Sequence, residues 1–204
     1  GIKKMLPGVL IQYRQGESGE WSETFNQPWW SFQTVAKAGS ERQFAGSEAD
    51  AVEELDRLLK QVVQEQSVAD VAVGAFLSGG IDSSSIVAIM QSVSERPVES
   101  FTIGYDDVSY DESSDAKRIA AHLGTNHHEW IITARDAMGG IPELPTLYDE
   151  PFADASQIPT TLVSRFARSH VTVSLSGDGG DELFGGDNRH YWAPRLLRKI
   201  GNIP

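Results

Sequence analysis

The sequence predicts an α/β fold, in which an open and mostly parallel sheet carries helices on both faces and follows a short β-hairpin. Two observations lead to this prediction. From residue 70 onward, short apolar runs alternate with segments of helical periodicity, which is the pattern of successive β–α units. Two glycine-rich, acidic loops also each follow an apolar run, as expected at the sheet edge where parallel strands end.

The N-terminal part has the pattern of a hairpin. Residues 9–13 read as a strand, residues 16–19 as a turn and residues 21–25 as a returning strand. Residues 34–46 are interpreted as a linker. The sequence therefore predicts a small β unit in residues 1–33 that is separate from the α/β part, which we expect to begin at residue 47.

A strong helix is predicted after Ser47. Ser47 is a suitable N-cap, and Glu48, Asp50, Glu53 and Glu54 lie near the positive end of the helix dipole. Apolar residues then recur at helical spacing, namely Val52, Leu55, Leu58, Leu59, Val62 and Val63.

The α/β part is predicted to contain four strands, at residues 71–77, 98–103, 128–132 and 171–175. Helices are predicted between and after them, at residues 83–94, 111–123 and 158–169, with an irregular proline-rich stretch before the last one. Ligands of such sheets bind outside the carboxyl ends of the strands, where both glycine-rich loops are expected to lie.

Composition excludes several classes of function. The chain has 204 residues, no cysteine and a formal net charge of −12. This charge argues against a surface for nucleic acid or anionic membrane, and no stretch reaches the roughly 20 apolar residues of a membrane span. No signal peptide is evident, so the cytoplasm is the expected location.

The first glycine-rich loop, residues 77–85, reads LSGGIDSSS. Gly79 and Gly80 allow backbone N–H groups to converge, and the start of the next helix adds free donors, so the loop has the properties of a phosphate cradle. It is not a Walker A loop, because it contains no lysine. A carboxylate beside phosphate requires a divalent cation between them, so Asp82 is interpreted as a Mg²⁺ ligand.

The second loop, residues 175–186, reads LSGDGGDELFGG and also follows a predicted strand. One interpretation makes it a second ligand set for Mg²⁺, with Asp181 facing Asp82 across the sheet edge. The alternative is a flexible acidic surface loop. The first interpretation gains weight because both loops are predicted at the same edge.

These motifs resemble those of a known family. The SGG-x-DS turn resembles the pyrophosphate loop of the N-type ATP pyrophosphatases, whose fold is of the adenine nucleotide alpha hydrolase type. Within that group the chain resembles the glutamine-dependent asparagine synthetases, through the segments DVAVGAFL, SFTIG, AHLGTNHHE and SGDGGDELFGG, in the family's order. The segment KMLPG, residues 4–8, resembles the end of that family's glutaminase domain.

The resemblance implies roles for individual residues. The ATP phosphates would be held by Ser78, Gly79, Gly80, Asp82, Ser83 and Ser84. Mg²⁺ would be held by Asp82 and Asp181, and the adenosine would be flanked by Leu77 and Ile103, largely through backbone contacts. Near the α-phosphate and the activated carboxylate would lie Ser176 and Gly177. The catalytic carboxylates would be Asp181 and Asp178, the latter in the position of a glutamate that assists ammonia attack in many relatives. The amino-acid substrate would lie beside Asp154 and Ser156.

The implied activity is an ATP-dependent, AMP-forming amide ligation with ATP and Mg²⁺. Aspartate would be activated at its β-carboxylate, and ammonia released from glutamine by a glutaminase domain would give asparagine. By this resemblance, residues 1–33 end a glutaminase domain and residues 47–204 form a truncated synthetase domain, whose catalytic lysine lies beyond Pro204, so that this chain alone lacks full activity. The alternatives are a β-lactam synthetase-like or other ligase acting on another carboxylate, and a non-catalytic nucleotide-binding module. A homodimer is an open alternative to a monomer.

Overall fold

The computed structural model describes residues 3–106, 111–151, 153–186 and 188–200. The chain divides into two compact units, Gly1–Glu54 and Leu55–Pro204. The boundary lies inside helix α2 (Glu48–Gln66), a few residues after the predicted start of the α/β part. The assignment of the parts to a glutaminase domain and a synthetase domain stays a prediction.

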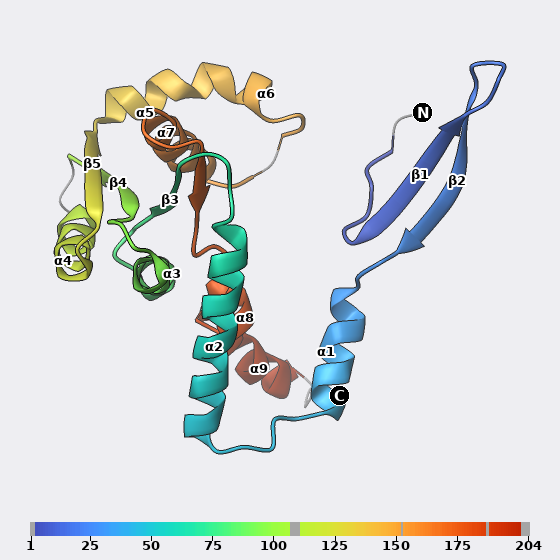
Figure 1. Ribbon diagram of the computed structural model, residues 1–204, viewed down its shortest axis with the longest axis horizontal. Helices are drawn as coiled ribbons and strands as arrows, with labels where there is room; N and C mark the ends of the chain where they lie inside the picture. The colour runs from blue at the N-terminus through green and yellow to red at the C-terminus, as the bar shows by residue number, and fades with distance from the viewer. Residues whose placement is uncertain (1–2, 107–110, 152, 187, 201–204) are drawn as a thin grey trace. The chain divides into compact units, whose positions relative to one another are not determined.

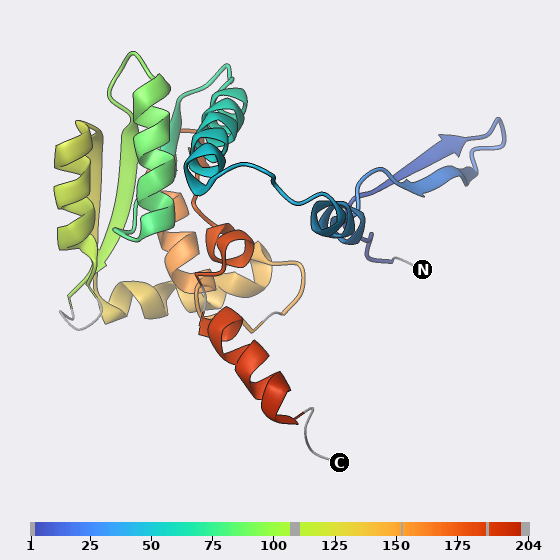
Figure 2. The same cartoon turned by 90° about the horizontal axis from the view of Figure 1, so that it is seen from below.

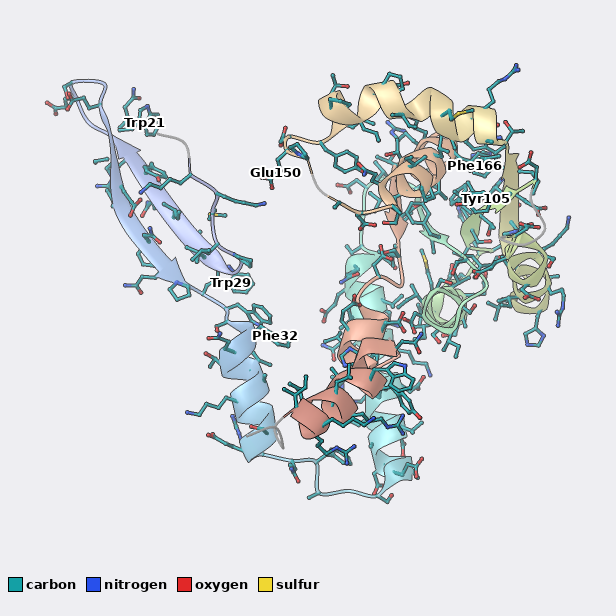
Figure 3. The ribbon with its side chains drawn as sticks, turned by 180° about the vertical axis from the view of Figure 1, so that it is seen from behind. Trp21, Trp29, Phe32, Tyr105, Glu150 and Phe166 are labelled. Atoms are coloured by element: carbon teal, nitrogen blue, oxygen red, sulfur yellow. The ribbon has the colours of Figure 1, made fainter. Side chains whose placement is uncertain are left out.

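The first unit contains the predicted hairpin. Strands β1 (Val9–Gln15) and β2 (Trp21–Pro28) pair antiparallel, with an irregularity in register between Gln12 and Tyr13 (Figure 1). The turn between them is closed by the Gly16 N–H, which donates to the Glu20 carbonyl over 2.9 Å. Trp21 and Trp29 are exposed on this unit (Figure 3). The hairpin prediction is confirmed.

The segment predicted as a linker, residues 34–46, is largely helical, and its assignment as a linker stays a prediction. Most of this segment belongs to helix α1 (Phe32–Glu41), and only the residues after it are irregular. The Ser31 side chain accepts a hydrogen bond from the Thr34 N–H and so caps the helix. Ala36 and Ala38 have high helix propensity, which favours the helix despite Gly39.

The predicted cap of helix α2 is confirmed. The Ser47 N–H donates to the Asp50 carboxylate over 2.8 Å, and the Asp50 N–H donates to the Ser47 hydroxyl over 3.3 Å. These reciprocal bonds form a capping box, which satisfies two N–H groups that the helix itself leaves free.

The second unit contains a four-stranded sheet in the order β5-β4-β3-β6. Each neighbouring pair is parallel, and the strands are β3 (Val73–Phe76), β4 (Glu99–Tyr105), β5 (Asn126–Ile132) and β6 (Val173–Leu175). The four predicted strands and their parallel arrangement are therefore confirmed.

Helices cover both faces of this sheet, as predicted. Helices α3 (Ile81–Val93) and α4 (Ser113–Leu123) lie on one face, and α5 (Ala134–Gly140) and α7 (Gln157–Arg168) lie on the other (Figures 1 and 2). Two clusters of buried side chains follow from this arrangement. The first lies under α2, α3 and α4 and includes Val63, Ala75, Leu77, Val87 and Ala116; the second lies under α7 and includes Phe101, Ala167 and Val171.

Two further segments differ from the prediction or extend it. The stretch expected to be irregular contains α5, the 3-10 helix η1 (Ile141–Glu143) and α6 (Leu144–Leu147). A capping box between Thr133 and Asp136 begins α5, and prolines stand at the starts of η1 and α6, where the missing N–H is tolerated. After β6, the second glycine-rich loop leads into α8 (Gly180–Phe184) and then α9 (Asn188–Ile200). In the described part of the chain, no helix combines the length and the apolar character needed to cross a membrane.

Candidate nucleotide site

The first glycine-rich loop connects the carboxyl end of β3 to the first turn of α3. Gly79 has φ of +86°, a conformation that side chains disfavour. A Cβ atom on Gly79 would lie 3.2 Å from the Ala116 nitrogen and 3.3 Å from the Glu112 carbonyl oxygen. The glycine therefore allows the loop to turn while it packs against the start of α4.

Serine hydroxyls hold this loop in shape. The Ser83 hydroxyl accepts from the Ser78 N–H over 3.1 Å, and the two hydroxyls lie 2.9 Å apart. The Ser78 hydroxyl also accepts from the Gly80 N–H over 3.3 Å. Ser78 and Ser83 thus have a structural role in addition to their predicted contact with phosphate.

Ser84 differs from the other two serines. Its hydroxyl is buried and has no hydrogen-bond partner among the described residues. Buried hydroxyls are normally paired, and an unpaired one in a loop of this kind is suited to a ligand oxygen.

Leu77 contributes to the core as well as to the loop. Its side chain is 1% exposed and belongs to the cluster under α2, α3 and α4. Its N–H donates to the Phe101 carbonyl over 2.9 Å, and its carbonyl accepts from the buried Thr102 hydroxyl. The backbone groups that were predicted to contact adenosine therefore already hold β3 to β4.

The second loop touches the first. A Cβ atom on Gly177 would lie 2.6 Å from the Ser83 nitrogen and 2.7 Å from the Asp82 carbonyl carbon, so only glycine fits there. Gly180 packs in the same way against the Asp82 carboxylate. The expectation that both loops meet at one edge of the sheet is confirmed.

This packing places Asp82 beside the residue that precedes Asp181. Among the described residues, no group of three or more histidine, aspartate or glutamate side chains could hold a metal ion. Mg²⁺ is nevertheless commonly bound by one or two carboxylates together with phosphates and waters, so Asp82 and Asp181 fit the donor set that Mg²⁺ requires. That Asp82 and Asp181 together bind a metal ion stays a prediction.

Asp178 and Ser176 are held together at the same edge. The Ser176 hydroxyl donates to the Asp178 carboxylate over 3.2 Å, and the Asp178 N–H donates back to that hydroxyl over 3.4 Å. Both side chains are exposed, so they can reach a ligand on this edge.

A pocket of about 360 Å³ opens beside the first loop. Three of the predicted adenosine and phosphate residues line it, namely Leu77, Ser78 and Ile103. The remaining lining residues are Phe76, Phe101, Thr102, Tyr105, Glu112, Pro159, Thr160 and Val163. None of the described residues that line it is lysine or arginine.

The predicted substrate residues lie apart from this pocket. Asp154 and Ser156 precede α7 and are exposed, and neither is among the described residues that line the pocket. Hydrogen bonds from the Ser156 hydroxyl and N–H lower the pKa of the Asp154 carboxyl. Farther along α7, Pro159, Thr160 and Val163 line the pocket.

Sequence reasoning missed part of this site. Tyr105 is the last residue of β4 and Glu112 is the N-cap residue of α4, so both lie at the edge of the sheet where the first loop follows β3. The strand–helix alternation could have indicated them. Pro159 and Thr160 come from the opposite face of the sheet, and no local pattern marks them.

Comparison with known protein families gives a clear match. The family model described as asparagine synthase matches residues 54–204, which include both glycine-rich loops. The chain belongs to the asparagine synthase family.

Curated members of the asparagine synthase family align with most of the chain. A putative glutamine-hydrolyzing asparagine synthetase 2 of Methanocaldococcus jannaschii is 40% identical over 161 residues, which is 74% of this chain and 31% of that protein. The glutamine-hydrolyzing asparagine synthetase 1 of Bacillus subtilis is 39% identical over 158 residues, which is 74% of this chain and 25% of that protein. The asparagine synthetase B of Escherichia coli is 28% identical over 200 residues, or 89% of this chain and 34% of that protein. The chain spans between a quarter and about a third of the length of these relatives.

Solved structures outside the asparagine synthase family show a distant likeness. An NH3-dependent NAD synthetase from Campylobacter jejuni aligns with a TM-score of 0.47 and 15% identity, over 64% of this chain and 58% of that one. The fold assignment rests on the strand order and helix arrangement described above.

Proposed function

We propose that this chain binds ATP with Mg²⁺ at the carboxyl edge of its sheet, and that the natural protein containing it is an AMP-forming amide ligase. In this proposal aspartate is activated at its β-carboxylate, and ammonia derived from glutamine converts it to asparagine. The name "glutamine-hydrolyzing", which the aligned relatives carry, supports glutamine as the ammonia source.

One observation carries the proposal, namely the contact of Gly177 with the backbone of Asp82 and Ser83. It brings the glycine-rich turn, with the unpaired hydroxyl of Ser84 close by, against an acidic loop, beside the pocket that Ser78 and Ile103 line. A nucleotide with its base in the pocket and its phosphates on the first loop would present its α-phosphate to the second loop. This is the arrangement that transfer of AMP to a carboxylate requires, because positioning supplies much of the catalysis.

The chemistry consists of two displacements. A β-carboxylate oxygen of aspartate attacks the α-phosphorus of ATP, the bond from this phosphorus to the bridging oxygen breaks, and pyrophosphate leaves. Ammonia then attacks the acyl carbon, the carbon–oxygen bond to AMP breaks, and the nitrogen loses a proton. In this scheme the first loop binds and orients the leaving pyrophosphate, and Asp178 is the carboxylate placed to take that proton. Bound Mg²⁺ would neutralise charge on the phosphates, held by Asp82 and Asp181.

The test is product formation by the natural protein that contains this chain. With ATP, Mg²⁺, aspartate and either ammonia or glutamine, we expect AMP, pyrophosphate and asparagine in equal amounts. AMP that depends on a different carboxylate would refute aspartate as substrate and favour a β-lactam synthetase-like ligase. ATP binding without AMP release for any carboxylate would favour a non-catalytic module instead.

A further inference from the structure

The end of strand β4 and the start of helix α4 both contribute to the pocket beside the first loop, through Tyr105 and Glu112. We propose that Asp111 is a positioning residue of the proposed ligase, because its carboxylate joins these two elements and so holds the pocket in register with the first loop. This inference rests on the proposed function, since it concerns how the proposed ATP site keeps its shape.

The Asp111 carboxylate is bonded to both elements. Its Oδ1 atom accepts from the Tyr105 N–H over 3.3 Å and from the Ser113 N–H over 3.1 Å. Its Oδ2 atom accepts from the Ser113 hydroxyl over 3.0 Å. Tyr105 is the last residue of β4 (Figure 3), and Ser113 is the first residue of α4 and is buried. One side chain therefore fastens the end of a strand to the start of a helix.

Gly104 leaves the space in which this carboxylate lies. A Cβ atom on Gly104 would lie 2.7 Å from the Asp111 Oδ1 atom and 2.8 Å from the Ser113 Cβ atom. A larger residue at position 104 would therefore displace the carboxylate. Gly104 directly follows Ile103, which lines the pocket, so the bonds of Asp111 are made immediately behind a pocket residue.

The start of α4 in turn packs against the first loop. A Cβ atom on Gly79 would lie 3.2 Å from the Ala116 nitrogen and 3.3 Å from the Glu112 carbonyl oxygen. That carbonyl accepts from the N–H groups of Asp115 and Ala116, each over 3.2 Å. The contacts thus run from β4 through Asp111 and the first turn of α4 to Gly79. If this turn moved, the pocket would shift relative to the first loop.

Asp111 acts through these elements and not on a ligand. It is not among the described residues that line the pocket. Hydrogen bonds from the Ser113 hydroxyl and N–H lower the pKa of its carboxyl, so the group is an ionised acceptor at neutral pH. A nucleotide that spans the pocket and the first loop requires a fixed separation between them, and a site that must be ordered on binding loses affinity. Inorganic pyrophosphate would occupy the first loop alone, so its binding does not depend on that separation.

The test measures the affinities for Mg²⁺·ATP and Mg²⁺·pyrophosphate by calorimetry, in the natural protein that contains this chain. In Asp111→Ala we expect the dissociation constant for Mg²⁺·ATP to rise about tenfold, and that for Mg²⁺·pyrophosphate to change by about twofold or less. Asp111→Asn should stay within about twofold of wild type for both ligands, because its amide oxygen can accept from both N–H groups and its amide nitrogen can donate to the Ser113 hydroxyl.

Asp136→Ala is the matched control. The Asp136 carboxylate accepts from the Thr133 N–H over 2.8 Å and from the Thr133 hydroxyl over 2.6 Å at the start of α5, and Asp136 is not among the described pocket residues. The control therefore removes similar bonds from another helix start. We expect it to lower the thermal unfolding midpoint about as much as Asp111→Ala does, and to leave both affinities unchanged.

Each contrary outcome has a separate meaning. Equal losses for ATP and pyrophosphate in Asp111→Ala would show that Asp111 shapes the first loop alone, and would overturn the inference. Equal losses in Asp111→Asn and Asp111→Ala would assign the effect to charge, and a similar loss in Asp136→Ala would assign it to general destabilisation; both would overturn it too. Should Asp111→Ala fail to fold, Ser113→Ala, which removes only the hydroxyl donor, must weaken Mg²⁺·ATP binding by about threefold or more without weakening that of Mg²⁺·pyrophosphate. If wild type bound neither ligand, the proposed function would fail as well, whereas wild-type binding that Asp111→Ala matched would refute the inference alone.

Discussion

Replacement of Gly177 by alanine is the sharpest test of how the two loops fit together. The new methyl group would lie 2.6 Å from the Ser83 nitrogen and 3.0 Å from the Ser83 Cα atom. Ordinary contacts of Cβ atoms begin at about 3.4 Å, so the loops must separate by roughly 0.8 Å. Because the obstructing atoms are backbone atoms in the first turn of α3, no side chain can rotate away.

Two effects follow from this displacement. Overpacking of this kind costs about 1–3 kcal/mol, which in a chain of this length lowers the unfolding midpoint by roughly 2–12 °C. The same displacement moves the second glycine-rich loop away from the first by close to 1 Å. Misplacement on this scale can reduce activity by about a hundredfold, and we expect the affinity for Mg²⁺·ATP to fall at least tenfold.

The assays are a thermal scan without nucleotide and calorimetric titration with Mg²⁺·ATP. Gly139→Ala is the matched control, because Gly139 is exposed in α5 and a methyl group added there would have no atom within 4 Å. We expect the control to match wild type or to be slightly more stable, as alanine favours helix. A Gly177→Ala variant with wild-type stability and affinity would refute the close contact of the two loops.

Three further predictions concern individual groups. Asp82→Asn should reduce the affinity for Mg²⁺·ATP, measured by calorimetry, by about tenfold or more. Its thermal unfolding midpoint without nucleotide should stay near that of wild type, and a large drop in this midpoint would contradict the prediction. Thr102→Val should lower the free energy of unfolding by about 1–3 kcal/mol in urea, because the buried Leu77 carbonyl loses its donor; an unchanged value would contradict that bond. Stability should fall as the pH drops from 7 to 4. Burial lowers the pKa of His127 below 6.5. For Glu99, burial alone would raise the pKa, but the hydrogen bonds from Asn126 and His128 outweigh burial and lower the pKa below 4.5. In both cases the unfolded chain binds protons more readily than the folded chain, so protonation at low pH favours unfolding. If the midpoint of unfolding did not change between pH 7 and pH 4, the environments described for His127 and Glu99 would be refuted.

The sheet and the two loops were predictable because their signals are local. The nearly continuous apolar run around Val73 is typical of a strand buried on both faces, and each glycine-rich loop directly follows such a run. Parallel strands end at one edge, so both loops were expected there; Gly177 meets Asp82 because β6 pairs with β3. The sequence could not supply the distance between them, since this depends on how β3 and β6 pair.

The features that were missed depend on weaker or non-local signals. Helix α1 has a cap at Ser31 but no long apolar stripe, so its pattern resembles that of a linker. Helix α5 begins at a capping box of Thr133 and Asp136, within a stretch whose prolines suggest irregular chain. The part of the pocket formed by Pro159 comes from the face opposite α4, and only the packing of α7 on the sheet brings it there.

The charge of the candidate site implies that the proposed nucleotide binds together with a metal ion. Asp82, Asp178 and Asp181 lie on the two loops and Glu112 is among the residues that line the pocket, while no described lining residue is lysine or arginine. ATP carries several negative charges, so bare ATP would meet repulsion that hydroxyls and N–H groups cannot offset. A P-loop protein places a lysine at the phosphates, whereas here a divalent cation between carboxylate and phosphate is the remaining source of positive charge. Removal of Mg²⁺ should therefore abolish ATP binding to the wild-type protein, and binding that persists in a chelator would show that basic groups elsewhere in the natural protein complete the site.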